Sequence, residues 1–186
     1  SKVGTTGKGI GPTYSDKAAR VGLRVGDIQG DFLPKYEVLK ARHLQILKDL
    51  GFTDFDITEE EKTWLKGIDY MRRFPITDTE HEINRALAEG KNVLAEGAQG
   101  SLLDIDHGTY PFVSSSSTTI GGVCTGLGIA PQSIGRVWGI FKAYSTRVGS
   151  GPFPVELFDE KGEEIRRVGK EFGAVTGRNR RCGWVD

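Results

Sequence analysis

The sequence predicts an α/β fold, in which helices alternate with short apolar strands. Three amphipathic patterns typical of helices occupy the first half of the chain, and two apolar runs typical of buried strands follow them. Glycine makes up 26 of the 186 residues, about twice its usual share. Because glycine adopts backbone conformations that are closed to other residues, this excess indicates many shaped loops between the elements.

Residues 1–30 are predicted to form loops and turns, since GTTGKGIGPTY contains four glycines and a proline. A helix is predicted over about 31–50, where apolar side chains recur every three or four positions. Pro34 falls in the first turn of this helix, where proline is tolerated. Gly51 suits its C-terminal end.

A second helix is predicted to begin near Thr58, because Thr58 and Glu61 have the spacing of a capping box. It should end before Pro75, since the residue that precedes a proline avoids helical geometry. A third, short helix is predicted over about 79–88, where Gly90 stops it.

Two short strands are predicted after these helices. The apolar run 92–95 enters the turn 96–100 and has the pattern of a buried strand that carries a loop at its C-terminal end. In open α/β sheets, ligands bind at that end of the strands. The run 137–144 is the second predicted strand, and a helix near 160–170 precedes an arginine-rich terminal loop.

Charge and composition exclude several classes of protein. The 25 basic and 25 acidic side chains balance, which argues against a dedicated nucleic-acid binder. No apolar run approaches the roughly 20 residues that cross a bilayer, and the first residues lack the apolar region of a signal peptide. Cys124 and Cys182 form no CxxC pair, so neither a zinc ribbon nor a disulfide framework is expected.

Basic residues concentrate near the two ends of the chain, beside glycine-rich loops. Residues 166–181 carry six lysine and arginine side chains and a single acid, Glu171. This placement suits a small polyanion such as a nucleotide. The alternating Arg178 and Arg180 are able to face two neighbouring anions. A nuclear-targeting or RNA-binding patch is the alternative interpretation, although three arginines are few for either.

Two further segments near the N-terminus are candidates for binding anions. Residues 4–12 look like a phosphate loop, but they satisfy neither the Walker A pattern nor GxGxxG, and a structural turn is about as plausible. Lys17 and Arg20 are spaced to share one face of a helix. Taken alone, they are better explained as a solvated basic face.

The middle of the chain adds polar loops. The Gln99 amide donates and accepts hydrogen bonds at once, so it could orient a ligand heteroatom. Asp104, Asp106 and His107 could suggest a metal site, but structural hydrogen bonding is the better interpretation of so compact a set. The six hydroxyl residues 114–119 are either a flexible linker or a ligand-contacting loop.

Four of these segments occur together in a specific order: GTTGKGIGPTYSDKAARVGLRVGD, LAEGAQGSLLDIDHGTYPFVSSSSTTIGGVCTG, KAYSTRVGSGPFP and GAVTGRNRRCGWVD. In this order they resemble the adenylosuccinate synthetase family. The resemblance is close over about two thirds of the chain and rests mainly on placement over 28–92. It implies the central portion of a P-loop-NTPase-like α/β enzyme, with a mostly parallel sheet and a helical insert at about 31–90. Residues 1–186 would then form a partial single domain.

The resemblance implies GTP-dependent ligation of IMP and L-aspartate to adenylosuccinate, with Mg²⁺, in de novo AMP biosynthesis. GTP would phosphorylate the 6-oxygen of IMP, and the aspartate amine would then displace the phosphate. Phosphorylation turns a poor leaving group into a good one, and such transfer relies on positioning and charge neutralisation. A cytoplasmic homodimer that binds neither nucleic acid nor membrane is expected.

The resemblance also assigns roles to residues. The catalytic residues would be Gln99, which helps to hold the 6-phosphoryl state, and Lys17. The residues that would contact IMP are Thr6, Arg20, Gln99, Ser114 and Arg178. The residues of the aspartate-binding loop would be Ala174, Val175, Thr176, Gly177, Arg178, Asn179 and Arg180.

Four of these assignments carry more detail. Arg20 would reach the IMP of the neighbouring subunit, which implies the homodimer. Arg178 would bridge IMP and aspartate, and Arg180 would approach GTP. Ser114 stands where many members have threonine, and its hydroxyl should keep the contact with IMP.

Two parts of the family pattern are not found in the sequence. No GDEGKG-like segment occurs, although the family carries its catalytic aspartate and histidine and its Mg²⁺ ligands there. The C-terminal guanine-recognition segment is also missing, so a central and inactive fragment is expected, with no metal ligand of its own. The alternative hypothesis is a non-enzymatic module that binds purine nucleotides, and a nucleic-acid-binding piece is the third.

Overall fold

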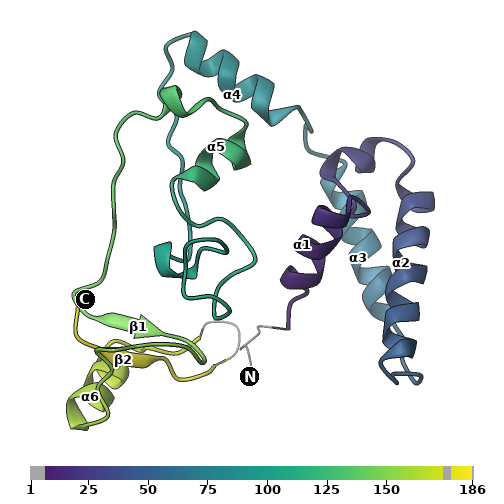
Figure 1. Cartoon of the computed structure of the whole chain (residues 1–186). Coiled ribbons are helices and arrows are strands. Elements are labelled where there is room, and N and C mark those ends of the chain that lie inside the picture. The colour runs from purple at the N-terminus through teal and green to yellow at the C-terminus, as the bar shows by residue number, and fades with distance from the viewer. Residues whose placement is uncertain (1–6, 174–176, 186) are drawn as a thin grey trace. The chain divides into compact units, whose positions relative to one another are not determined.

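The computed structural model describes residues 7–173 and 177–185 (Figure 1). Contacts within the chain define two compact units. One unit comprises Ser1–Gly11 together with Ile83–Asp186, and the other comprises Pro12–Glu82. The sequence-based expectation of one partial domain stays a prediction.

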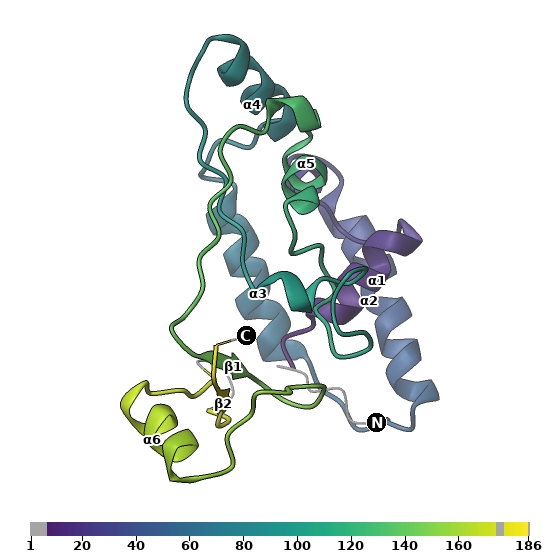
Figure 2. The same cartoon turned by 60° about the vertical axis from the view of Figure 1, so that its left-hand side comes forward.

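The unit Pro12–Glu82 is helical. Its main elements are α2 (Phe32–Asp49) and α3 (Thr58–Met71), which lie side by side (Figures 1 and 2). Both helices were predicted from their apolar periodicity and are confirmed. The first turn of α2 contains Pro34, and Gly51 follows its end with a φ of +87°, a conformation that favours glycine.

A small apolar core joins these helices. Ile28, from the short 3-10 helix Val25–Gln29, packs with Phe32 and Ile68, and all three are buried. The Trp64 ring lies 5.5 Å from Phe32 and 4.9 Å from Tyr36 between centroids. Aromatic rings at such separations contribute more stability than the burial of their apolar area alone would give.

The N-terminal cap of α3 differs from the predicted one. The expected capping box of Thr58 and Glu61 is wrong, because Thr58 already lies inside the helix. Asp56 instead accepts hydrogen bonds from the Thr58 backbone N–H at 3.0 Å and from its hydroxyl at 2.5 Å. Glu61 turns to the neighbouring helix, where it accepts hydrogen bonds from Tyr36 and Lys40 at 2.8 Å each.

Helix α1 (Ile10–Ala19) was not foreseen, since residues 1–30 were predicted to form loops and turns. The helix begins beside the glycine-rich segment, with Pro12 in its first turn, where proline costs little. The seven residues that follow contain no glycine, and they end on Ala18 and Ala19, which favour a helix. The helix was missed because the glycine-rich segment dominates the local sequence, and the residues that favour a helix begin only at the end of that segment.

The larger unit contains helices α5 (Gly121–Leu127) and α6 (Glu160–Val168), and helix α4 (Thr79–Ala88) leads into it. Two further 3-10 turns, Ser101–Leu103 and Pro131–Ser133, lie in its loops. The predicted helices at 79–88 and 160–170 are confirmed. Gly90 follows α4 with a φ of +74°.

Within the described residues, the sheet consists of β1 (Ser145–Arg147) and β2 (Arg181–Gly183). The two strands are antiparallel, and Thr146 is paired with Cys182. Helix α6 lies beside β2 (Figure 2). The mostly parallel sheet that the resemblance implied is not present in this part of the chain.

The strands predicted at 92–95 and 137–144 do not form in the described structure, where both runs lack regular secondary structure and are unpaired. Leu94 is 92% exposed, and Ile140 is 97% exposed. A strand is stabilised by a ladder of hydrogen bonds to a neighbour, and neither run has such a neighbour among residues 7–173 and 177–185. Both runs therefore have the apolar sequence of buried strands, but they are not hydrogen-bonded to a neighbouring strand in the described part of the chain. None of the helices described here has the length and apolarity needed to span a membrane.

Candidate functional site

The turn 96–100 presents Gln99 in an unusual backbone conformation. Gln99 has a φ of +66°, and Gly100 follows with a φ of +134°. A positive φ is uncommon in residues other than glycine and often marks a functional turn. The Gln99 side chain is exposed, so its amide is accessible to a ligand.

The hydroxyl residues 114–119 lie against this turn. The sequence left open whether they form a flexible linker or a loop that contacts a ligand. The Thr118 hydroxyl donates to the Gly100 carbonyl at 2.6 Å. The Ser114 backbone N–H donates to the Leu103 carbonyl at 2.8 Å, and the Ser114 hydroxyl lies 3.3 Å from that of Ser116. The segment is therefore part of a structured loop cluster and not a flexible linker.

A cavity of about 430 Å³ adjoins the same two loops. That volume falls in the usual range for small-molecule sites. One wall is formed by residues 93–98 and the other by residues between 117 and 127. The polar side chains that line it are Glu96, Ser117, Thr118 and Thr119.

A fully buried carboxylate, that of Asp104, holds the loop cluster together. The structural interpretation of this residue is confirmed, whereas His107 contributes only its backbone N–H. Gly108 lies so close that a Cβ there would meet the Asp104 carbonyl oxygen at 2.5 Å. The donors to the Asp104 carboxylate are the backbone N–H groups of Asp106, His107, Thr118 and Thr119 and the Ser117 hydroxyl.

Hydrogen bonds from backbone N–H groups, led by that of Asp106, hold the pKa of Asp104 well below its usual value although burial opposes ionisation. A depressed carboxyl pKa contributes stability that is present above about pH 4 and is lost as the pH falls toward the folded-state pKa. We expect Asp104→Asn to lower the melting temperature by about 5 °C or more at pH 7. We also expect the variant to lose part of the acid destabilisation that the parent shows between about pH 4 and pH 2.

Thermal unfolding at several pH values tests this expectation. Asp106→Asn is the matched control, because the Asp106 backbone is a donor in the cluster while its carboxylate is not the acceptor. Equal melting temperatures for Asp104→Asn and the parent at pH 7 would contradict the assigned role of the buried carboxylate.

The C-terminal arginine segment forms a hairpin. Phe172 and Asn179 form an isolated antiparallel bridge, and the Gly173 N–H donates to the Arg178 carbonyl at 2.8 Å. Gly177 has a φ of +64°, and its N–H donates to the Gly173 carbonyl at 2.7 Å. Arg178 lies in the second arm of the hairpin, and its surface is exposed.

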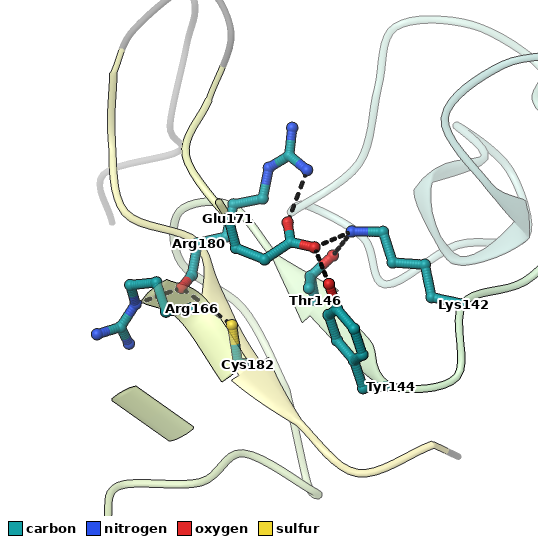
Figure 3. Close-up of polar contacts among 7 residues, drawn as sticks. All are labelled: Lys142, Tyr144, Thr146, Arg166, Glu171, Arg180 and Cys182. Atoms are coloured by element: carbon teal, nitrogen blue, oxygen red, sulfur yellow. Dashed lines mark hydrogen bonds and ion pairs between the residues drawn. The ribbon is translucent and has the colours of Figure 1, made fainter. Parts of the chain in front are cut away.

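Glu171 lies at the start of this hairpin, and its carboxylate is buried (Figure 3). Its Oε1 accepts hydrogen bonds from Lys142 Nζ at 2.7 Å and from Tyr144 Oη at 2.6 Å. Its Oε2 accepts one from Arg180 Nη1 at 2.8 Å. Burial opposes ionisation, but these three donors outweigh it and keep the pKa of Glu171 below its usual value.

A second ion pair stabilises the strands beneath the hairpin. Arg181 Nε donates to both carboxylate oxygens of Glu156 at 2.8 Å, and Nη2 also pairs with this carboxylate. Arg147, from β1, donates to the Thr109 hydroxyl at 3.1 Å and to the Phe112 carbonyl at 2.9 Å. These hydrogen bonds of Arg147 join β1 to the loop cluster of Asp104 within one unit.

Lys17 and Arg20 lie in the other unit, at the end of α1. Both are exposed, and Lys17 Nζ lies 5.7 Å from the centroid of the Tyr14 ring. Arg20 has a φ of +63°, just beyond the helix. Of the other site residues predicted from the sequence, those outside the described part of the chain are Thr6, Ala174, Val175 and Thr176.

No metal site is evident among residues 7–173 and 177–185, which contain no group of three or more His, Cys, Asp or Glu side chains suited to a cation. Asp104 cannot serve as such a ligand, because backbone N–H groups already occupy both of its oxygens. The described residues therefore contain no cluster of side chains that would hold Mg²⁺ without further ligands.

The whole chain, residues 1–186, matches the model of the family described as adenylosuccinate synthetase. The chain belongs to the adenylosuccinate synthetase family. It is 63% identical over 186 residues to the adenylosuccinate synthetase of Bacteroides fragilis, and 60% identical over 185 residues to that of Porphyromonas gingivalis. These matches cover all of this chain but 44% of each relative, so the chain spans less than half of their length.

A solved member of the adenylosuccinate synthetase family shows the same fold over this chain. The fully ligated enzyme of Plasmodium falciparum matches with a TM-score of 0.87 and 42% sequence identity. The match covers 100% of this chain and 43% of that one. The resemblance drawn from the four sequence segments is thereby confirmed, as is the α/β class.

Sequence reasoning missed several residues that organise the site. Lys142 and Tyr144 were placed in an apolar strand, and their polar ends meet Glu171 from 29 and 27 positions away. The signal for Glu171 was present, because it is the single acid in the basic segment 166–181. An isolated acid among cations is expected to pair with them, although its partners are not readable from the sequence.

Proposed function

We propose that the protein carrying this chain ligates IMP and L-aspartate to adenylosuccinate, with GTP as the phosphoryl donor, in AMP biosynthesis. The observation that carries the proposal is the family match over residues 1–186. The loop cluster around Gln99 and the arginine hairpin support it, because both belong to one unit and present polar groups suited to a nucleotide.

The proposed reaction has two steps. The N1 proton of IMP is removed by a base, and the 6-oxygen attacks the γ-phosphorus of GTP, which gives 6-phosphoryl-IMP and GDP. The neutral aspartate amine then attacks C6, the phosphate leaves with the oxygen, and the nitrogen loses one proton and keeps the other. The first step makes an amide-like oxygen a good leaving group, and positioning with charge neutralisation accelerates it.

Gln99 is proposed to hold the 6-oxygen region of IMP through its accessible amide, with Lys17 as a second catalytic group. IMP would be contacted further by Thr6, Ser114, Arg20 and Arg178. The segment 174–180 would bind aspartate, with Arg178 bridging to IMP and Arg180 approaching GTP. Arginine suits these anions because its planar guanidinium donates two parallel hydrogen bonds to a carboxylate or phosphate.

Mg²⁺ is proposed as the metal of the complete reaction, as the family implies. Its ligands would lie in the family's GDEGKG-like segment, which does not occur in this sequence.

The apolar runs 92–95 and 137–144 are proposed to be strands of a mostly parallel sheet in the complete enzyme. Their support is the exposure of Leu94, Ile140 and Phe141, at 92%, 97% and 84%. Large apolar side chains at such exposure are expected to be covered by other protein. A crystal structure of the complete gene product in which both runs stay unpaired would contradict this proposal.

A steady-state assay of the complete gene product that carries this chain tests the proposed function. Adenylosuccinate should form only when GTP, IMP, L-aspartate and Mg²⁺ are all present, and omission of any one should abolish it. Nucleotide binding by calorimetry without product formation would favour the non-enzymatic module instead.

A homodimer with shared sites is proposed, in which Arg20 reaches the IMP of the partner subunit. If so, Arg20→Ala and Arg178→Ala are each inactive, yet mixing them should restore activity. Random hybrids carry one native site each, so up to about a quarter of the parent activity should return. Mixtures that stay inactive after subunit exchange would contradict the shared site. Two samples of the same variant, mixed in parallel, are the control.

The cytoplasm is proposed as the location, because Cys124 and Cys182 are free thiols, as is usual in a reducing compartment. Fractionation that recovers the protein outside the cytoplasm would contradict this proposal.

A further inference from the structure

Arg180 and Arg181 are adjacent arginines that pair with different carboxylates in different ways. Arg181 uses Nε and Nη2 on Glu156, and its Nη1 donates to the carbonyls of Gly149 and Gly151 at 3.2 and 2.9 Å. All of its nitrogens are therefore engaged within the protein, which is the pattern of a structural ion pair.

Arg180 donates to Glu171 through Nη1 alone, at 2.8 Å. Its Nε is buried, and no described residue accepts a hydrogen bond from it. The Nε–Nη2 edge of a guanidinium presents two parallel donors, which matches a carboxylate or a phosphate. The side chain of Arg180 as a whole is 31% exposed, although Nε itself is covered, so part of the side chain is open to solvent.

Glu171 is held more firmly than Arg180. Its side chain is 4% exposed, and Lys142 and Tyr144 bind the oxygen opposite to the one that Arg180 uses (Figure 3). The backbones are also joined, since the Arg180 N–H donates to the Glu171 carbonyl at 2.9 Å. Arg166 Nε in turn donates to the Arg180 carbonyl at 2.9 Å.

The charges of this cluster favour an anion. One carboxylate lies between two cations, Lys142 and Arg180, so the group as a whole keeps a positive charge. Glu171 thus fixes the direction of the Arg180 guanidinium without cancelling the local charge. A fixed guanidinium loses less conformational freedom when it binds than a mobile one.

We propose that Glu171 is a positioning residue, which holds Arg180 so that the part of the guanidinium that Glu171 does not use receives an anionic group of a substrate. This inference rests on the proposed function, in which Arg180 serves the aspartate loop and approaches GTP. The anion is a carboxylate if it comes from L-aspartate and a phosphate if it comes from GTP, and separate Michaelis constants for the two substrates distinguish these sources.

The test is a double-mutant cycle in the complete gene product, with Glu171→Gln, Arg180→Ala and the double variant. Glu171→Gln should raise KM for L-aspartate or GTP about tenfold, as expected for a lost charge-assisted hydrogen bond, with KM for IMP unchanged. In the Arg180→Ala background the same change should add less than about twofold, because its effect passes through Arg180.

Two further variants keep the test decisive. Glu156→Gln is the matched control, since it breaks the neighbouring ion pair and should lower the melting temperature without changing any KM. Tyr144→Phe removes one hydrogen bond, of 2.6 Å, from Glu171 but keeps the carboxylate. It should fold normally and raise the same KM about threefold, even if Glu171→Gln proves unstable.

The outcomes separate the inference from the proposed function. If Arg180→Ala leaves every KM unchanged, the proposed role of Arg180 is wrong and the inference is lost with it. If Arg180→Ala acts as proposed but the Glu171 effect is additive, absent or matched by Glu156→Gln, only the positioning role is overturned.

Discussion

Replacing Arg178 with alanine is expected to reduce kcat/KM of the complete enzyme by about hundredfold or more. The reason is that a guanidinium bridging two anionic substrates supplies several charge-assisted hydrogen bonds, each worth about tenfold. The hydrogen bond from the Gly173 N–H to the Arg178 carbonyl uses the backbone, so the change does not remove its acceptor. Steady-state kinetics with IMP and L-aspartate varied in turn measure the loss.

Arg167→Ala is the matched control for Arg178. Arg167 is also exposed and belongs to the same basic segment, but it has no assigned role. Its replacement should change kcat/KM by less than about twofold if the effect of Arg178 is specific rather than a matter of overall charge. Equal losses for the two variants would point to a general electrostatic effect and against the bridging role.

Replacing Gln99 is expected to lower kcat by about hundredfold to thousandfold, the range seen when a donor to a developing charge is removed. Gln99 has a φ of +66°, so alanine would add backbone strain to the loss of the amide. Gln99→Gly removes the amide without that strain and is the more informative variant. Kinetics of both variants, with Gln132→Ala as an exposed glutamine control, separate chemistry from folding.

If Gln99→Gly keeps the parent kcat while Gln99→Ala does not, the amide has no catalytic role. The positive φ would then be the functional feature of the turn.

Local sequence patterns predicted the helices α2, α3, α4 and α6, but they predicted neither α1 nor α5. Helix α2 was predicted at about 31–50 and spans Phe32–Asp49, because its periodic apolar face and Gly51 are both local signals. The N-terminal cap of α3 was misplaced, because the helix begins at Thr58 and Ile57 takes the capping position. Asp56 and Thr58 are both good capping residues, and the sequence alone does not show that Asp56 accepts hydrogen bonds from Thr58.

Pairing between distant segments was the part that the sequence did not predict. The strands β1 and β2 are three residues each and join positions 145–147 to 181–183. The apolar runs 92–95 and 137–144 carry a stronger strand pattern but have no partner in the described part of the chain. Strand propensity reports how well a side chain fits a sheet, and it does not supply the neighbouring strand.

Sequence patterns indicated the loops of the candidate site, but they did not indicate the contacts that hold these loops together. Gln99, Ser114 and Arg178 stand out in the sequence as glycine-flanked or hydroxyl-rich loop residues, and the structure places their loops in one unit. The buried carboxylates of Asp104 and Glu171 organise those loops. Their partners are up to 29 positions away in the sequence, so these contacts depend on the fold.

The most direct test of the central claim follows the 6-oxygen of IMP. The complete gene product is supplied with GTP, L-aspartate and IMP that carries ¹⁸O at position 6, and the inorganic phosphate is analysed by ³¹P NMR. If 6-phosphoryl-IMP forms, the label must appear in the phosphate, because the oxygen leaves bonded to phosphorus. Label recovered in water, with unlabelled phosphate, would contradict the two-step reaction and the role assigned to Gln99.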